Sequence, residues 1–174
     1  MSNKPDSNQK QKSGMDILRN RRSIRHFKDD MPDENLLRKV LDSVTDAPTS
    51  RNKPSCYLVI VRDSKLIENL GDIRGRSTSP ISKSPVAVAI VADTDITKRP
   101  EDDSIIASYH LMLAAKYYGL GTCYIADMNR DNVKKMLDIP QNHYIGTITP
   151  LGIPDENPNR PDKESIIKRS KFLD

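Results

Sequence analysis

Four side chains near the start of the chain are suited to binding a phosphate group. They fall within five residues: Arg21, Arg22, Ser23 and Arg25. A guanidinium group presents pairs of N–H donors that match two phosphate oxygens, and a serine hydroxyl adds a compact donor beside them. Short basic runs also occur on solvated surfaces. The cluster alone therefore leaves two interpretations open, a phosphate site and an exposed basic turn.

A second segment has the composition of a binding loop. It follows an apolar helical pattern and reads Ala47-Pro48-Thr49-Ser50-Arg51-Asn52. Its hydroxyl and amide groups could bind a polar ligand, but these residue types are equally typical of a turn between a helix and a strand. The run Gly119-Leu120-Gly121 is ambiguous in the same way, since glycine commonly ends helices. No Gly-x-Gly-x-x-Gly dinucleotide motif accompanies it.

Other kinds of catalytic chemistry have little support. The three histidines lie in separate predicted elements and no serine has the context of a nucleophile elbow, so we expect no hydrolase triad. Cys56 and Cys123 have no metal-ligand spacing, and two cysteines make no disulfide framework. We expect no metal site and reduced thiols, as in a cytoplasmic protein.

Apolar periodicity places these segments between helices and strands. Helical spacing of leucine and valine predicts a helix that Pro32 and Asp33 open and Ala47-Pro48 ends. Further helices are predicted at 64–70, 105–118 and 131–137. Strands are predicted at 56–61, 86–91, 122–125 and 143–151, with 86–91 apolar enough to be covered on both faces. This alternation predicts an α/β or α+β layered sandwich, with the order of the strands left open.

Local signals predict where several of these elements begin and end. Gly71 is expected to stop the helix at 64–70, and Asn129 to cap the helix at 131–137. Asp102 and Asp103 are candidate caps for the helix at 105–118. The polar segments 74–83 and 93–102 are expected to be flexible loops.

Length and composition predict one folded domain. The chain has 174 residues, and Met1 is the single apolar residue of the first fourteen, so we expect a disordered tail over 1–14 and a domain over 15–174. The 28 basic and 24 acidic residues are interspersed, with a net charge of +4, which argues against a dedicated nucleic-acid surface. No run approaches the roughly 20 apolar residues of a membrane-spanning helix. We expect neither nucleic acid nor membrane as a partner.

Four segments, read in order, resemble the nitroreductase family of FMN-dependent oxidoreductases. They are Arg21-Arg22-Ser23-Ile24-Arg25-His26-Phe27, Ala47-Pro48-Thr49-Ser50-Arg51-Asn52, Gly119-Leu120-Gly121-Thr122-Cys123-Tyr124-Ile125, and Leu151-Gly152-Ile153-Pro154 with Arg160 beyond. Each is weak alone, but their order and spacing over about residues 15–165 are fairly specific. The family usually continues Asn-x-Gln-Pro-Trp, whereas this chain has Asn52-Lys53-Pro54-Ser55-Cys56. The resemblance implies an α+β fold, a nitroreductase-like three-layer α/β/α sandwich in an interlocked homodimer.

The resemblance also implies a tightly bound FMN. The phosphate and ribityl chain would contact Arg21, Arg22, Ser23 and Arg25, with Arg160 approaching from the C-terminal segment; an exposed tail charge is the alternative for Arg160. Against the flavin ring, from the partner subunit, would lie Pro48, Thr49, Ser50 and Asn52, with Asn52 at the polar edge. The segment that brings its backbone to the reactive ring nitrogen would be Tyr124, Ile125, Ala126 and Asp127. No catalytic side chain is implied, because the cofactor carries the chemistry.

The implied activity is electron transfer from NAD(P)H, bound transiently, through FMN to a nitroaromatic, quinone or similar small acceptor. Two alternatives stay open. One is a specialised flavin-dependent reaction, such as flavin or halide chemistry, whose substrate the segment 93–102 would select. The other is a non-catalytic module that holds FMN as a structural or regulatory ligand, or whose basic tail contacts polyanions. The missing glutamine and tryptophan after Asn52 favour the second alternative to some degree.

Overall fold

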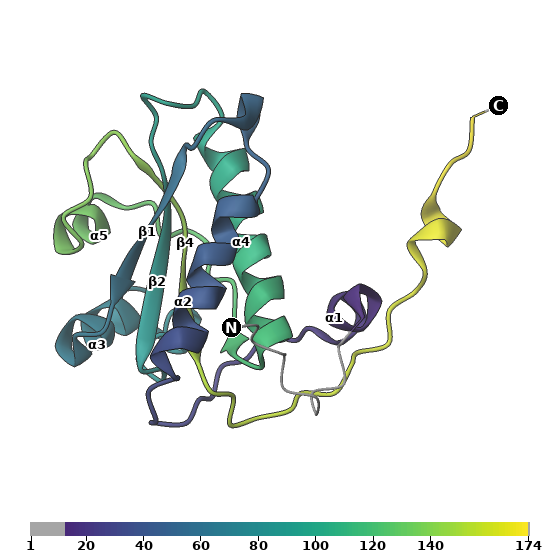
Figure 1. Ribbon diagram of the computed structural model, residues 1–174, viewed down its shortest axis with the longest axis horizontal. Helices are drawn as coiled ribbons and strands as arrows, with labels where there is room; N and C mark the ends of the chain where they lie inside the picture. Colours follow the sequence, from purple (N-terminus) through teal and green to yellow (C-terminus); the bar gives the residue numbers. More distant parts are fainter. Residues whose placement is uncertain (1–12, 174) are drawn as a thin grey trace, which may run out of the picture.

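The computed structural model describes residues 13–173, and its centre is a four-stranded antiparallel sheet (Figure 1). The strands lie in the order β1-β2-β4-β3 and have these bounds: β1 (Cys56–Val61), β2 (Val86–Ala92), β3 (Gly121–Thr122) and β4 (Tyr144–Gly152). Three of the four strands agree with the predicted bounds to within one residue at each end. The order of the strands is new information, because periodicity says nothing of pairing.

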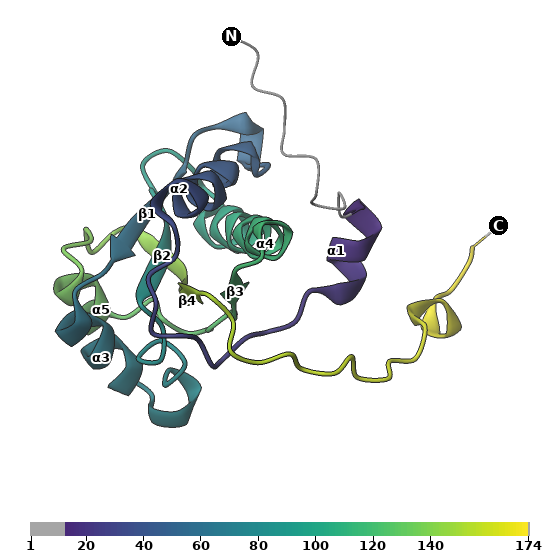
Figure 2. The same ribbon diagram turned by 60° about the horizontal axis from the view of Figure 1, so that its bottom comes forward.

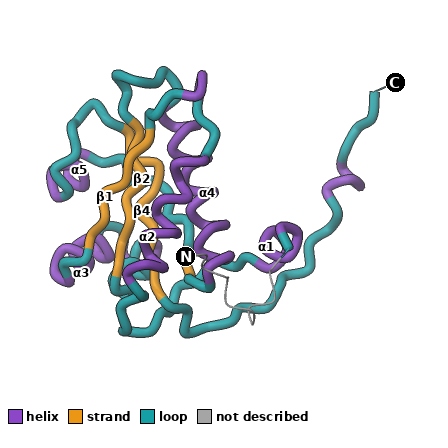
Figure 3. Tube along the Cα trace, viewed as in Figure 1, coloured by secondary structure: helices purple, strands orange, loops and turns teal. Residues whose placement is uncertain are grey.

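Helices cover both faces of the sheet (Figures 1 and 3). On one face lie α2 (Glu34–Asp42) and α4 (Pro100–Tyr118), and on the other lie α3 (Ser64–Asp72) and α5 (Asp131–Met136). The predicted three-layer α+β sandwich is therefore confirmed. Outside these layers lie α1 (Gly14–Asn20) and a C-terminal arm with the single turn η4 (Ile166–Arg169), as Figure 2 shows. Three further 3-10 turns are η1 (Ser43–Asp46), η2 (Ser50–Asn52) and η3 (Gly75–Ser77).

Strand β2 joins the two cores of the molecule. All seven of its residues are buried, as its continuous apolar sequence predicts. Successive side chains of a strand point to opposite faces. Val86, Val88 and Ile90 accordingly pack with α2 and α4, whereas the alternate residues pack with α3 and α5.

Helix α4 is the longest element and begins five residues earlier than predicted, at Pro100. Proline suits the first turn of a helix because N–H groups there have no acceptor within the helix, so the lack of one costs nothing. The N-cap position is Arg99, so Asp102 and Asp103 are first-turn residues and the prediction that they cap the helix is wrong. At the other end Gly119 has a φ of 84°, and the Leu120 N–H donates to the Ala115 carbonyl (2.8 Å). The predicted glycine terminus is confirmed.

Two other local predictions are wrong for reasons of packing. Gly71 lies inside α3, where a Cβ would stand 2.6 Å from the Cβ of Ser82, so this glycine permits close approach and does not end the helix. Asn129 does not cap α5, because Arg130 is the N-cap and the Asn129 side chain accepts from the Ile145 N–H (3.2 Å). The segment 74–83 is a loop as expected, but Ile81 is fully buried within it.

Strand β3 ends at Thr122, although a strand is predicted to Ile125. Beyond it, threonine side chains of β4 replace the backbone ladder. The Thr147 hydroxyl accepts from the Ile125 N–H (3.1 Å) and donates to the Ile125 carbonyl (2.8 Å). The Thr149 hydroxyl donates to the Cys123 carbonyl (2.8 Å). Side-chain hydrogen bonds therefore hold this segment along the edge of β4.

No helix within residues 13–173 combines the length and the apolar character needed to cross a bilayer. The predicted disordered tail, residues 1–14, lies outside the described residues except for its last two. Of these, Ser13 caps α1, since its hydroxyl accepts from the Asp16 N–H (3.1 Å). Gly14 is the first residue of that helix.

Candidate functional site

The basic cluster lies in a cleft between α1 and the start of the C-terminal arm. The cleft has a volume of about 510 Å³, and its lining residues include Arg21, Arg22, Ser23, Arg25 and Arg160. In Figure 2 the chain that follows α1 runs beside the chain that leads to the arm. The structure therefore brings the four N-terminal residues and Arg160 to one place, although they lie at opposite ends of the sequence.

Two donor atoms in this cluster are buried and have no acceptor among the described residues, Nη1 of Arg21 and Nε of Arg22. The Nη1 atom of Arg22 donates to the carbonyls of Arg19 (2.9 Å) and Arg21 (2.7 Å), which fixes its guanidinium group at the end of α1. A buried donor without an acceptor is unfavourable, and a cationic donor bonds most strongly to an anion. The cluster thus fits a bound phosphate.

Contacts from two distant segments hold the backbone of the cluster. A carboxylate oxygen of Glu156 accepts from the backbone N–H groups of Arg25 and of His26, the latter at 3.1 Å. The Ile24 N–H donates to the Thr122 carbonyl (2.9 Å), and a Cβ on Gly121 would stand 2.8 Å from Cγ2 of Ile24. Gly121 therefore allows the cluster to dock on β3. Sequence analysis missed Glu156, because its contact with Arg25 spans 131 positions and a single glutamate makes no pattern.

The predicted loop Pro48–Asn52 is held by a carboxylate that sequence analysis interpreted differently. Asp103, only 2% exposed, accepts from the Ser50 N–H (2.8 Å) and from the Ser55 hydroxyl (2.7 Å). Two loop residues that are not glycine have left-handed backbones, Arg51 with φ 58° and Asn52 with φ 53°. This conformation is unfavourable for residues with a Cβ, so the anchor at Asp103 maintains a strained loop.

The Asp103 carboxyl is ionised more readily than an ordinary aspartate. Burial raises its pKa, but hydrogen bonds from Ser55, the Ser50 N–H and Thr97, together with the charge of Arg99, outweigh burial and hold the pKa below its usual value. A carboxylate that accepts several hydrogen bonds is stabilised in its charged form. Asp103 thus remains a charged acceptor for the loop at neutral pH.

The loop and the basic cluster do not meet within one chain. Asp103, which holds the loop, is in the first turn of α4, whereas Lys116 near its last turn lines a small hollow of about 100 Å³ beside Arg21 and Arg22. Thirteen helical steps from residue 103 to residue 116 span about 20 Å. Of the predicted site, the structure brings together the arginine cluster and Arg160, and leaves Pro48, Thr49, Ser50 and Asn52 at the other end of the helix.

The third predicted segment, Tyr124 to Asp127, follows β3 along the edge of β4. The N–H of Ile125 already donates to Thr147 and is not available to a ligand. The Tyr124 hydroxyl donates to the Gly146 carbonyl (3.0 Å), although the side chain is 40% exposed. The last two residues of this segment, Ala126 and Asp127, are exposed.

Two arginines that sequence analysis missed fix the end of this segment. Arg74 donates to the Ala126 carbonyl (2.8 Å) and lies 3.4 Å from the Asp127 carboxylate. Arg130 donates to the same carboxylate at 2.6 Å. The hydrogen bond from Arg130, together with the charges of Arg130 and Arg74, outweighs desolvation and holds the pKa of Asp127 below its usual value. These contacts hold Asp127 in a left-handed conformation with φ 62°.

The cysteines give no sign of nucleophilic chemistry. Burial raises the pKa of Cys56 and that of Cys123 to about 11 in each case. The thiolate is the reactive form of cysteine. Both residues are free thiols that stay protonated at neutral pH.

Comparison with known proteins connects these features to one family. The model of the nitroreductase family matches residues 18–93 and 81–153. A protein of Methanothermobacter thermautotrophicus named "Putative NADH dehydrogenase/NAD(P)H nitroreductase" is 29% identical over 160 residues, which cover 86% of this chain and 83% of the relative.

Solved structures have the same fold. An FMN-dependent nitroreductase from Clostridium difficile is 28% identical, with a TM-score of 0.82 over 91% of this chain and 98% of that protein. An iodotyrosine deiodinase bound to FMN and 3-iodo-L-tyrosine has a TM-score of 0.74 over 92% of this chain and 100% of that one. Its identity is 22%, so this likeness concerns the fold alone.

Proposed function

Because the chain belongs to the nitroreductase family, we propose that it is an FMN-dependent oxidoreductase that transfers electrons from NAD(P)H to a nitroaromatic, quinone or similar small acceptor. The observation that carries this proposal is the basic cleft that Arg160 helps to line, where two buried guanidinium atoms have no acceptor within residues 13–173. When bound, FMN would supply the electron carrier between the two substrates. We assign this activity to the domain 15–174, and we propose that the protein is cytoplasmic.

In this proposal the cleft binds the anionic end of the cofactor. Arg21 and Arg22 would donate from the buried atoms that have no acceptor among the described residues. Ser23, Arg25 and Arg160 line the same cleft and would complete the contacts to the phosphate and ribityl chain. Several directional cationic donors bind a phosphate more specifically than one point charge does.

A homodimer would complete the site, since the loop at Pro48–Asn52 lies far from the cleft of its own chain. Large apolar side chains on α4 are 40–49% exposed: Ile105, Ile106, Tyr109 and Tyr117. The C-terminal arm extends away from the body of the molecule (Figure 1). Each of its large apolar side chains is 61–81% exposed: Ile166, Ile167, Phe172 and Leu173. Surfaces of this kind are typical of interfaces. We propose that a second copy covers both surfaces.

In the dimer the two remaining segments would contact the flavin ring from opposite chains. The partner would contribute the loop with Pro48, Thr49, Ser50 and Asn52. The segment Tyr124 to Asp127 would contribute the exposed residues Ala126 and Asp127, because the Ile125 N–H is already bonded. Each segment also has an exposed polar residue that could contact the flavin ring. These residues are Asn52 in the loop and Tyr124 in the segment after β3.

The first test is the visible spectrum of the protein after FMN addition and desalting, followed by anaerobic mixing with NADH or NADPH. Retained flavin at about one per chain, bleached by either donor, is the expected result. Retained flavin that neither donor reduces would favour a structural or regulatory flavin. A colourless protein that binds no FMN would contradict the proposal itself.

A second reaction is worth testing because of one structural neighbour. The iodotyrosine deiodinase that holds FMN and 3-iodo-L-tyrosine aligns over its whole length with this chain. Reductive release of iodide from 3-iodo-L-tyrosine, measured with reduced protein, would place this chain among the specialised flavin reactions. Turnover of nitroaromatics or quinones without iodide release would support the first proposal.

A further inference from the structure

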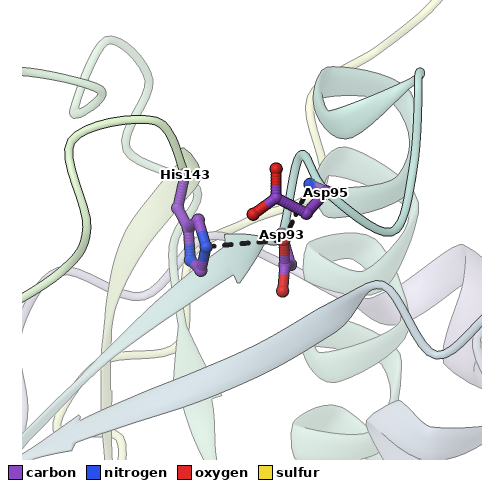
Figure 4. A group of neighbouring side chains, drawn as sticks. All are labelled: Asp93, Asp95 and His143. Carbon is purple, nitrogen blue, oxygen red and sulfur yellow. Dashed lines mark hydrogen bonds and ion pairs between the residues drawn. The ribbon is translucent and has the colours of Figure 1, made fainter.

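Three side chains that can ligate a metal converge at the end of the sheet opposite the basic cleft: Asp93, Asp95 and His143 (Figure 4). Strand β4 separates the two places. Thr122, which lines the hollow beside the cleft, is opposite Leu151 near one end of this strand, and His143 precedes its other end. Seven residues of strand span about 23 Å. The cluster is therefore far from the proposed phosphate cleft, although Asp95 lines a hollow together with Ser50 of the loop Pro48–Asn52.

The register of the sheet places two of the three side chains together. Ala92 is opposite Tyr144, so Asp93 and His143 occupy the next position along the same antiparallel pair. The Asp93 N–H donates to the Ser55 carbonyl (2.8 Å), which fixes the turn out of β2. Sites supported by strands have better-defined geometry than sites on free loops.

The geometry of the pair suits a tetrahedral metal. Nε2 of His143 lies 3.4 Å from Oδ1 of Asp93. Two ligand atoms each about 2.1 Å from a tetrahedral zinc ion lie about 3.4 Å apart. All three ligand atoms lie within 4.8 Å of one another, and Figure 4 shows the Asp95 carboxylate directed toward the imidazole. Asp95 is exposed, so a small rotation of its side chain can bring it into the same coordination shell.

A residue outside the cluster orients the imidazole. The hydroxyl of Tyr57 lies 2.9 Å from Nδ1 of His143, and the His143 side chain is only 14% exposed. When Nδ1 donates its proton to the Tyr57 oxygen, Nε2 presents a lone pair toward Asp93. Histidine ligands of metals commonly donate from their other ring nitrogen in this way.

The charges of the cluster also favour a cation. Among residues 13–173, neither Asp93 nor Asp95 forms an ion pair with a lysine or arginine. Oδ1 of Asp93 accepts from the Asp95 N–H (2.8 Å), which orients the first carboxylate and leaves its remaining lone pairs available. Two neighbouring carboxylates attract a cation between them.

We propose that Asp93, Asp95 and His143 bind one zinc ion. One imidazole nitrogen and two carboxylate oxygens are donors that zinc accepts, whereas magnesium and calcium prefer oxygen donors alone. Three protein ligands leave a fourth position for water. The ion would join the end of β2, the segment that leads to α4, and the turn before β4. The sequence predicts no metal site, because two of the ligands are two positions apart and the third is nearly fifty residues away.

The test is equilibrium dialysis of the full-length, untagged protein against ZnCl2, with the metal content measured by mass spectrometry. We expect saturable binding of one zinc ion per chain, not displaced by excess MgCl2. Asp95→Asn should weaken binding at least tenfold without loss of folding, because the side chain is exposed. Tyr57→Phe should weaken it about tenfold through the orientation of His143, as other changes behind metal ligands do.

Matched variants make the result decisive. Asp162→Asn, an exposed aspartate in the arm, should bind zinc like the wild type, and His143→Gln should not bind it. If His143→Gln fails to fold, Asp95→Asn still decides the question. The proposal is overturned if the wild type binds no zinc saturably, or if Asp95→Asn binds it as tightly as the wild type does.

Discussion

The polar groups at the two ends of helix α4 differ in whether they have hydrogen-bond partners. At the C-terminal end, the neighbouring arginine cluster has buried donors without an acceptor among the described residues, Nη1 of Arg21 and Nε of Arg22. At the N-terminal end, Asp103 accepts hydrogen bonds from both Ser50 and Ser55. Among the described residues, the arginine end has two buried donors without an acceptor, whereas the carboxylate at the loop end is paired with donors of its own chain.

This difference predicts separate roles for the two regions in FMN binding. Donors that lack acceptors gain energy when a ligand arrives, so the arginine cluster should determine affinity. A loop whose backbone is already fixed loses little conformational entropy when it contacts a ligand. Pro48–Asn52 should therefore determine how the flavin ring is oriented. Separate substitutions can disrupt each end, and the effect expected on FMN affinity or stability decreases from Arg21→Ala with Arg25→Ala to the pH dependence of Asp103.

The largest effect is expected from Arg21→Ala combined with Arg25→Ala. Each charged hydrogen bond contributes about 1.5–3 kcal/mol, so the double variant should lose about 3–6 kcal/mol of FMN binding free energy. Fluorescence titration of FMN measures the loss. Arg38→Ala is the control, since Arg38 is an exposed arginine on α2 that pairs with Glu34 (3.0 Å). Equal affinity in the double variant and the control would remove the phosphate assignment.

Asp103→Ala should lower the free energy of unfolding by about 3 kcal/mol. It leaves the Ser50 N–H and the Ser55 hydroxyl without their acceptor, and each such group costs about 1–3 kcal/mol when buried. Urea unfolding of flavin-free protein measures this loss. Asp103→Asn keeps one carbonyl acceptor and should lose less. A loss confined to FMN affinity, with unchanged stability, would contradict the role of Asp103 as an anchor.

Gly121→Ala tests the arginine end without changing any charge. The added Cβ would meet Ile24 at 2.8 Å and push the cluster off β3. Such overpacking costs about 1–3 kcal/mol of stability, and FMN affinity should fall with it. Gly14→Ala is the control, because a Cβ there meets nothing within 4 Å. Unfolding and FMN titration of both variants show whether docking of the cluster matters.

The smallest effect is a pH dependence at the loop end. Because the pKa of Asp103 is lower in the folded chain, its ionised form stabilises the fold above the unfolded value of about 3.9. That contribution is lost as pH falls through the folded pKa. The stability advantage of the wild type over Asp103→Asn should therefore narrow below about pH 4. A constant difference in unfolding midpoints from pH 6 to pH 3 would contradict this linkage.

Features that depend on neighbouring residues were predictable from the sequence. The apolar run of β2 predicts a strand buried on both faces, and Gly119 predicts the end of α4. Both follow from local backbone preference and periodicity. The convergence of Arg160 with the arginine cluster came from family resemblance, because no local pattern joins two ends of a chain.

Contacts between distant residues were beyond sequence reasoning. The sequence places Asp103 just before the predicted helix at 105–118, where it resembles a cap, yet its partners Ser50 and Ser55 lie 53 and 48 positions away. Glu156 and Arg74 are single charged residues in polar segments, and their roles depend on how strands pair. Strand order decides which loops meet, and periodicity carries no information about that order.

The threonine bonds along β4 also affect how this chain meets other chains in a crowded solution. An open sheet edge offers unpaired N–H and C=O groups that can recruit a strand from another molecule and begin aggregation. Here the hydroxyls of Thr147 and Thr149 occupy the backbone groups of Ile125 and Cys123. The covering segment is irregular and follows a strand of two residues, so it is a poor template for further pairing. The same two hydroxyls that position the edge thereby protect it against edge-to-edge association.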